Sequence, residues 1–338
     1  MMVTLTDFLR ILTVSEVNRI AKDNAAKDIL KRYDNFWVID PDNDNEGVVF
    51  GEGVVFGDIQ TATAGTFAWA RPVLIAPGAG FNIGEMFLFG KDTAGLPLRW
   101  VGINKNILIL FDHAEHITDN RQAIHYRNPK IGNAKYEKSL VRDFLEKTFF
   151  STAFTVAEQE AIRTGNFVRM LRRFSGEIVV PEEVETISYM RYAKDQSVKS
   201  LVISPRKKSL KIHSMAFSES GLNKIIGLEY VSEIATRAFY GADLEGKLRF
   251  GDIQKIGGMA FAINNIQKLC FNGVVGTIDR EAFRNNQIVN IDCGDGFLKI
   301  DSKAFSENFV DEETREKVTE SVIIEYADDI FSGQGVYL

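Results

Sequence analysis

The most regular feature of the hydrophobic pattern is a repeat in the second half of the chain. The dipeptide Ala-Phe occurs five times with a constant step of 22 residues (238 − 216), at Ala216-Phe217, Ala238-Phe239, Ala260-Phe261, Ala282-Phe283 and Ala304-Phe305. Each alanine has an isoleucine four residues before it and an aliphatic residue six residues after it. A period of this length indicates a solenoid, in which each unit buries its apolar face only against its neighbours.

A short strand pattern follows several of these units. Apolar residues alternate in Val198-x-x-Leu201-x-Ile203, Ile266-x-x-Leu269-x-Phe271 and Ile288-x-x-Ile291-x-Cys293. Such alternation predicts strands with one buried face. Burial gains roughly 1.5–3 kcal/mol per side chain, whereas ordering the backbone costs about 1–2 kcal/mol per residue. We therefore expect the units to fold only as a stack, with alanine where chain segments approach closely.

Less regular units extend the array upstream. Residues 178–180 predict an opening strand, and Arg191-Tyr192 stands where later units have Ala-Phe. The step from Ile187 to Ile212 is 25 residues (212 − 187), three more than the period. We assign the surplus to the basic segment 205–209, which we interpret as a solvated turn.

The array ends downstream of Val310. Residues 311–320 are charged and predict a helix, and residues 321–326 predict a last strand. A polar terminal segment of this kind would cap the solenoid, whose final unit would otherwise expose its apolar face.

The repeats resemble the BspA-like leucine-rich repeat family, whose unit reads approximately I-x-x-x-A-F-x-x-x-x-x-L-x-x-I-x-(I/L)-P. The resemblance covers about residues 175–311, and only Pro181 of the repeat prolines is clearly present. It implies a solenoid with one strand per turn, used in surface proteins of bacteria and some protists to bind proteins, matrix or other cells. It implies no catalysis.

Residues 1–80 predict a helical arm followed by a β-rich segment. The first helix is expected because four apolar residues share one helical face: Leu5, Phe8, Leu9 and Leu12. A second helix can begin at Ser15-Glu16, and residues 36–80 are rich in β-forming residues and glycine. The arm either docks onto its own chain or anchors the protein to a larger assembly.

Residues 81–170 predict a small α+β domain. Strands are expected at 86–89, 98–103 and 107–111, followed by a polar loop over 112–135. Two helices come next, the first capped by Ser139 and the second by Thr155, with Glu158 placed as in a capping box.

Residues 81–165 also resemble an uncharacterised domain that is common in bacterial surface proteins, with the signature W-x-x-S-x-L-R-x-W-L-N-x-x-F-x-x-x-A-F-x-x-x-E-x-x-x-I. The matching residues are Tyr136-x-x-Ser139-x-Val141-Arg142-x-Phe144-Leu145-x-x-x-Phe149-x-x-x-Ala153-Phe154-x-x-x-Glu158-x-x-x-Ile162. Tyr136 and Phe144 replace tryptophans, and Glu146 replaces the asparagine. The resemblance implies a C-type-lectin-like arrangement of two helices against a small sheet, and it implies no activity.

Composition and charge argue against several classes of partner. The 338 residues include 40 basic and 46 acidic side chains, and the net charge of −6 gives no reason to expect nucleic acid or an anionic membrane. The longest apolar runs, such as 107–111, are far shorter than the ~20 residues of a spanning helix. Charged residues interrupt the first apolar stretch, so we expect no classical secretion signal. A cell surface, a virion and the cytoplasm all remain open as locations.

One loop concentrates the possible metal ligands: Asp112, His113, Glu115, His116 and His125. A solvated loop and a metal site are the two interpretations, and the spacing matches no known site. The two cysteines, Cys270 and Cys293, are too few for a disulfide framework or a structural zinc site. We expect no catalytic, metal or cofactor site. An enzymatic hypothesis would place hydrolysis around His113, His116 and Arg142.

The sequence thus predicts three parts: an N-terminal arm with a β-rich segment (1–80), a small α+β domain (81–170), and a leucine-rich-repeat solenoid with a C-terminal cap (175–338). The favoured function is non-enzymatic binding or adhesion, with the solenoid presented to a protein or glycan. The alternative is a structural or host-recognition component of a virion or similar particle. In that case the N-terminal part would anchor the chain, and the arm could also mediate oligomerisation.

Overall fold

The computed structural model describes residues 4–33, 36–40, 42, 46–50, 60–61, 67–112, 124–125, 135–326 and 328–333. Contacts divide the chain into two units, Met1–Ser175 and Gly176–Leu338. Each unit has its own sheets and its own buried hydrophobic residues.

A six-stranded antiparallel sheet with the order β1-β6-β9-β8-β7-β11 is the framework of the first unit. Its strands are β1 (Leu9–Arg10), β6 (Val73–Ile75), β7 (Met86–Lys91), β8 (Pro97–Asn104), β9 (Ile107–Leu110) and β11 (Arg172–Arg173). Two small sheets consist of β2 (Phe36–Asp40), β3 (Glu46–Phe50) and β4 (Gln60–Thr61), and of β5 (Phe67–Ala68) and β10 (Ile124–His125). The strands predicted at 86–89, 98–103 and 107–111 are confirmed as β7, β8 and β9.

Helical segments flank this sheet. They are η1 (Leu5–Asp7), α1 (Val14–Ile20), α2 (Asn24–Leu30), η5 (Tyr136–Lys138), α3 (Leu140–Asp143), the π-helical η6 (Phe144–Phe149), α4 (Phe150–Ala153), α5 (Val156–Arg163) and η7 (Phe167–Met170). The predicted caps Ser139 and Thr155 are confirmed at the starts of α3 and α5, and Thr155 forms a capping box with Glu158. The helix expected from Ser15-Glu16 begins slightly earlier, because Thr13 is its cap and pairs with Glu16.

The helix predicted from Leu5, Phe8, Leu9 and Leu12 is wrong. Leu9 and Arg10 instead form β1, which pairs with β6. Leu9 packs in one hydrophobic core of the unit, whereas Leu12 packs in the other. Residues of β9 alternate between the same two cores, so the cores lie on opposite faces of the sheet. The four apolar residues therefore do not share one helical face. The segment that contains β1 instead places Leu9 in the core on one face of the sheet and Leu12 in the core on the other.

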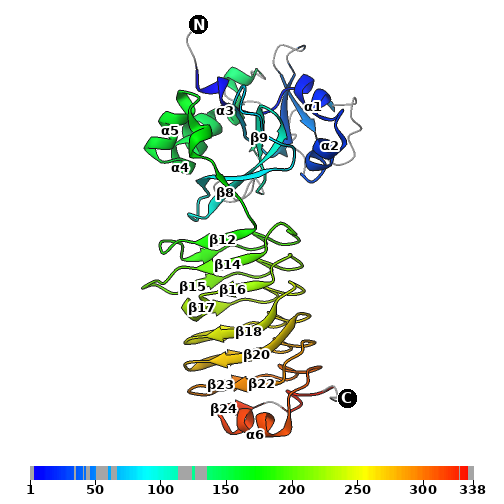
Figure 1. The fold of residues 1–338 in the computed structure, drawn as a ribbon, viewed down its shortest axis with the longest axis vertical. Helices are drawn as coiled ribbons and strands as arrows, with labels where there is room; N and C mark the ends of the chain where they lie inside the picture. Colours follow the sequence, from blue (N-terminus) through cyan, green and yellow to red (C-terminus); the bar gives the residue numbers. More distant parts are fainter. Residues whose placement is uncertain are drawn as a thin grey trace. The chain divides into compact units, whose positions relative to one another are not determined.

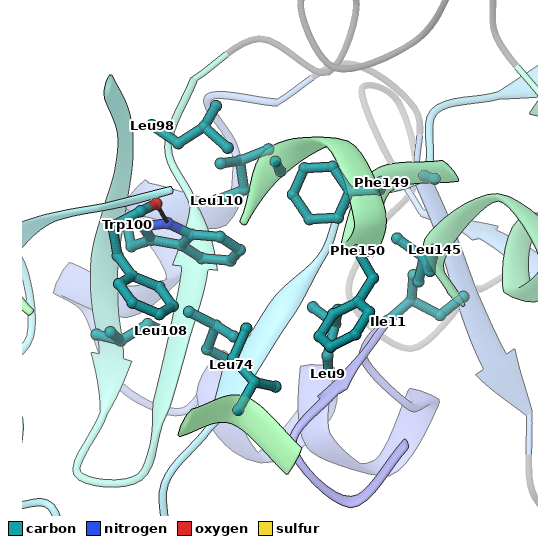
Figure 2. Packing of buried hydrophobic residues seen from close by; sticks show 14 of the residues in the cluster. Leu9, Ile11, Leu74, Leu98, Trp100, Leu108, Leu110, Leu145, Phe149 and Phe150 are labelled. Carbon is teal, nitrogen blue, oxygen red and sulfur yellow. Dashed lines mark hydrogen bonds between the residues drawn. The ribbon is translucent and has the colours of Figure 1, made fainter. Parts of the chain in front are cut away.

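Figure 2 shows the core on one face of this sheet, where side chains of β8 and β9 face the helical segments η6 and α4. Trp100 is fully buried and donates its indole N–H to the carbonyl oxygen of Phe89 at 2.8 Å. Leu108 lies beside it, and Phe149 and Phe150 approach from the helices. The opposite face is covered by α1 and α2. The predicted border between residues 80 and 81 falls between β6 and β7 of this one sheet.

The second unit is a β-solenoid whose rungs stack from β12 to β24 (Figure 1). A seven-stranded parallel sheet contains β13 (Thr186–Ile187), β15 (Leu210–Ile212), β17 (Val231–Ile234), β19 (Ile253–Ile256), β21 (Val275–Ile278), β23 (Phe297–Ile300) and β24 (Val322–Tyr326). Two three-stranded parallel sheets contain β12 (Glu177–Val180), β14 (Ser200–Ile203) and β16 (Lys224–Ile226), and β18 (Glu245–Phe250), β20 (Asn265–Phe271) and β22 (Asn290–Asp292). The 3-10 turn η8 (Leu228–Tyr230) follows β16.

Most turns have two strands, which corrects the single strand per turn that the family resemblance implied. The predicted strands after the Ala-Phe units form the three-stranded sheets. The isoleucine of each Ile-x-x-x-Ala-Phe unit ends a strand of the seven-stranded sheet, as Ile256 ends β19 and Ile278 ends β21. A second apolar residue three positions earlier, Ile253 or Val275, points into the same core. This additional strand was missed because its two inward residues are separated by two outward ones, which hides the alternation.

The repeat aromatics form one continuous stack inside the solenoid. Adjacent rings of Phe217, Phe239, Phe261, Phe283 and Phe305 have centroids 5.0–5.4 Å apart and interplanar angles of 1–14°. Tyr192 extends the stack at one end and Phe331 at the other. The degenerate unit at Arg191-Tyr192 is therefore confirmed as a rung.

The predicted cap is confirmed as α6 (Glu312–Glu320), which begins after Asp311, followed by β24. The array continues for one rung beyond the prediction, because Tyr326 pairs with Ile300 and Ile330-Phe331 occupies the Ala-Phe position. The helix lengthens this step to 26 residues (331 − 305), which removes the last unit from the 22-residue register.

The segment 205–209 is more than a solvated turn. The guanidinium of Arg206 is half-buried and donates to the backbone carbonyls of Val180, Pro181 and Val184 at 2.5–3.0 Å. Arg206 thereby bonds the segment 205–209 to the preceding turn of the solenoid.

Candidate binding surface of the solenoid

Each turn of the solenoid has two residues with a left-handed backbone, one directly before the alanine of the Ala-Phe position and one two residues after the aromatic residue. The first set is Met190, Met215, Arg237, Met259, Glu281, Lys303 and Asp329, and the second is Lys194, Glu219, Gly241, Ile263, Asn285, Glu307 and Gly333. Backbone N–H groups in this stretch donate to carbonyls of the next rung, as from Phe239 to Ala260 at 2.8 Å and from Phe261 to Ala282 at 2.8 Å. The turns are thus fixed in register along the array.

An asparagine ladder supports these turns from inside. Asn264, Asn286 and Asn308 lie three residues after successive phenylalanines and are buried. The side-chain oxygen of Asn286 accepts from the backbone N–H of Ile266 at 3.1 Å, and its amide donates to the carbonyls of Phe261 and Phe283 at 2.9 and 3.0 Å. Each asparagine therefore joins two rungs. The ladder corresponds to a Phe-x-x-Asn pattern in three successive units, a signal that the period of the apolar residues does not reveal.

The side chains at the first and second positions before each Ala-Phe pair form what we call the turn surface. Over six rungs it consists of Tyr189, Met190, Ser214, Met215, Thr236, Arg237, Gly258, Met259, Arg280, Glu281, Ser302 and Lys303. Residues at one column of this surface are one rung apart, which is about 4.8 Å in a parallel sheet. The turn surface therefore presents two side chains per rung in two regular columns.

The turn surface is hollowed near its centre by an open pocket of about 460 Å³, which we call the groove. It is lined by Ser214, Met215, Thr236, Arg237, Gly258, Met259 and Arg280, and its lining is mainly apolar. Gly258 stands in the column where the neighbouring rungs have Thr236 and Arg280, so the side chain absent at this position leaves space. The backbone of Gly258 is not left-handed, and a Cβ added there would meet the carbonyl oxygen of Arg280 at 3.3 Å.

Sulfur contacts hold the walls of the groove. The hydroxyl group of Tyr189 lies 3.8 Å from the sulfur of Met215, and the guanidinium of Arg237 lies 3.6 Å from the sulfur of Met259. The same guanidinium lies over the ring of Tyr240, 5.5 Å from its centroid. Both methionines are half-buried, whereas Tyr189 and Arg237 are exposed. The result is an apolar hollow with a cation at its wall.

The neighbouring charges are largely paired with one another. Glu281 is buried and contacts Arg280 and Arg284 at 3.4 and 3.3 Å, and Arg284 also pairs with Glu307 at 2.7 Å. On the seven-stranded sheet, Lys211 pairs with Glu233 of the next strand at 3.1 Å. The basic side chains on these surfaces are thus paired with acidic ones, whereas the lining of the groove contains no acidic residue.

Those sequence-predicted candidates that the structure describes do not converge on a reaction site. His113, Glu115 and His116 lie outside the described residues, and only the backbone of His125 is described. Asp112 is buried in an ion pair with Arg99, with two oxygen–nitrogen distances of 2.6 and 2.8 Å. The remaining candidates occupy structural or surface positions.

Arg142 forms an ion pair with Glu146, one helical turn further along the chain, at 2.7 Å. His213 is exposed beside the last residue of β15. Cys270 is buried and Cys293 is half-buried, and burial raises the pKa of the Cys293 thiol. Within the described residues, no group of three or more histidine, cysteine or acidic side chains is placed to hold a metal ion.

Residues 185–310 match, in six copies, the family described as BspA type leucine rich repeat region. The solenoid is a BspA-type leucine-rich repeat array. This family comprises surface binding and adhesion proteins and is typically non-enzymatic. The resemblance of residues 81–165 to a domain of bacterial surface proteins receives no support from the comparisons. Searches of curated proteins and of solved structures gave no significant match.

The BspA-type repeat accounts for the regular Ile-x-x-x-Ala-Phe positions of the solenoid. It does not account for the residues that line the groove. Met215, Arg237, Gly258 and Met259 lie within the matched range 185–310, at turn positions whose residue types vary from rung to rung. Sequence reasoning missed these residues because the repeat was recognised from its Ile, Ala and Phe positions, whereas these residues belong to the two columns of the turn surface. No helix in the described residues is long and apolar enough to cross a membrane.

Proposed function

We propose that this chain is a non-enzymatic binding protein whose BspA-type solenoid contacts a partner protein through the groove of the turn surface. One observation carries the proposal: methionine and arginine side chains of adjacent rungs line the groove, and Tyr189 contacts Met215 beside it. These residue types are enriched in protein interfaces. Methionine is suited to partners of irregular shape, because its thioether chain is flexible and polarisable.

The proposal is tested by presenting the full chain to arrays of purified cell-surface and matrix proteins, with a glycan array in parallel. The double variant Met215→Glu/Met259→Glu places two charges in the groove and should weaken protein binding by at least about tenfold. The matched control is Val179→Glu, which changes an exposed apolar residue of β12 on another face of the solenoid. Circular dichroism should show the same melting curve for control and wild type.

Other results would point to the alternatives. Binding to glycans alone would favour a glycan partner, and a C-type-lectin-like arrangement of residues 81–170, which stays a prediction, would be its natural site. Assembly of the purified chain into regular particles would favour a virion or similar component anchored by its N-terminal part. Protein binding that the groove variant and the control leave unchanged would contradict the proposal.

A further inference from the structure

The chemistry of the groove narrows the class of partner. We infer that the groove binds an acidic segment of a partner protein, with a carboxylate on Arg237 and a neighbouring aliphatic or aromatic side chain between Met215 and Met259. This inference rests on the proposed function and adds the chemical identity of the segment that is bound.

The charge of Arg237 provides the first step. Its guanidinium contacts the sulfur of Met259 and the ring of Tyr240, and no carboxylate lies within 4.0 Å of it among the residues that the structure describes. By contrast, Arg280 and Arg284 face Glu281. The lining of the groove includes two arginines and no acidic residue. An incoming carboxylate would therefore gain a charge-assisted hydrogen bond without displacing an existing ion pair.

The apolar lining provides the second step. Met215 and Met259 are two rungs apart, which is about 10 Å at the spacing of a parallel sheet. Gly258 leaves space between them and the side chain of Arg280. A hollow of this width takes one large apolar side chain, whose burial supplies affinity while the carboxylate on Arg237 fixes orientation. A phosphate or an anionic sugar would satisfy the arginine but would leave the methionines without an apolar partner.

The first test selects ligands for the immobilised full chain from a random peptide library displayed on phage. Enriched peptides should contain aspartate or glutamate next to an aliphatic or aromatic residue. A synthetic peptide of the enriched sequence should bind Arg237→Met at least about tenfold more weakly than wild type. The affinity of this peptide for Arg237→Met should also depend much less on salt concentration than its affinity for wild type does. Arg249→Met, which removes an exposed arginine from β18, should bind like wild type.

The second test fills the groove without changing its charge. Gly258→Thr copies the residue of the previous rung, Thr236, and the backbone at position 258 accepts a side chain with a shift of a few tenths of an ångström at the carbonyl of Arg280. The peptide should again bind at least about tenfold more weakly. Ser302→Thr is the matched control, because it enlarges the same column two rungs beyond Gly258 and outside the groove.

Three results would overturn the inference. Enriched peptides that lack acidic residues would refute the inferred occupant of the groove. So would peptides that Arg237→Met and Gly258→Thr bind as well as wild type does. Either result would still allow protein binding elsewhere on the chain. Binding of anionic glycans through Arg237, with no peptide enriched, would refute a protein segment as the occupant. Absence of both peptide and array binding would remove the inference and the proposed function together.

Discussion

The two units bury aromatic side chains in opposite ways. In the first unit each ring has its own surroundings: Trp100 donates to the carbonyl of Phe89 and lies 6.4–6.5 Å from Phe149 and Phe154 at different angles. In the solenoid one arrangement is reused, and Phe261 and Phe283 are parallel to within 1°. Repetition allows a residue to be compared with the residues at the same position in neighbouring rungs. Gly258 and Arg237 differ from their neighbours in this comparison, and the first unit has no repeat that would allow it.

The largest expected effect is the loss of a ring from the middle of the stack. Phe261→Ala removes contacts with Phe239 and Phe283 and leaves a cavity between rungs, so the free energy of unfolding should fall by about 3–5 kcal/mol. Phe331→Ala, at the half-exposed end, should cost only about 1–2 kcal/mol. Urea unfolding monitored by circular dichroism measures both. Equal losses at the two positions would mean that the stack is not the core of the solenoid.

A comparable loss is expected in the first unit from a single ion pair. Asp112→Ala leaves the buried guanidinium of Arg99 without its carboxylate, at a cost of about 3–5 kcal/mol. Hydrogen exchange should rise in β8 and β9 and stay unchanged over β19–β21. The control is Asp143→Ala, which removes a surface pair with Lys147 and should cost at most about 0.5 kcal/mol. Unchanged exchange in β8 would contradict the role assigned to the pair.

The asparagine ladder should contribute less per residue than the aromatic stack. Asn286→Ala deprives the N–H of Ile266 and the carbonyls of Phe261 and Phe283 of a partner, and the expected cost is about 2–3 kcal/mol. The exposed neighbour Gln287→Ala should stay within about 0.5 kcal/mol of wild type in the same urea titration. A smaller loss for Asn286 than for Gln287 would exclude a supporting role for the ladder.

How much of the fold could be predicted depended on repetition. The Ala-Phe period gave the stacked rungs, the tyrosine at position 192 and the capping helix, because a pattern repeated every 22 residues exceeds chance. Phe331 escaped detection because α6 shifts the register, and β1 because two residues of strand lie among apolar residues at helical spacing. Neither shift is encoded locally. Each depends on what pairs with the segment in three dimensions.

The candidate site was harder to predict than the fold. The loop at 112–135 attracted attention through its histidines, whereas the groove residues Met215 and Met259 are of a type common in cores. Both are half-buried at the left-handed position before an Ala-Phe pair, and only the structure shows this placement. The sequence of a solenoid reveals the period of its inward-facing residues. The binding surface consists of outward-facing residues, which do not follow that period.

The smallest effect has the opposite sign. Ile263 is a β-branched residue with φ of 59°, in a column where neighbouring rungs have Gly241 and Asn285. Left-handed backbone is costly for such residues, so Ile263→Gly should raise the free energy of unfolding by about 1 kcal/mol. The same change at Ile253, in β19, should destabilise strongly. Thermal melts compare the two variants, and destabilisation by Ile263→Gly would show that its side chain supports the fold.

The most direct measurement follows the methionine methyl groups of the full chain by NMR while the selected acidic peptide is added. The seven methionines include Met215 and Met259 in the groove and Met86 in β7 of the first unit. The account predicts that the signals of Met215 and Met259 shift together and saturate at the measured affinity, while that of Met86 does not move. Saturable binding that leaves the signals of both groove methionines unchanged would contradict it.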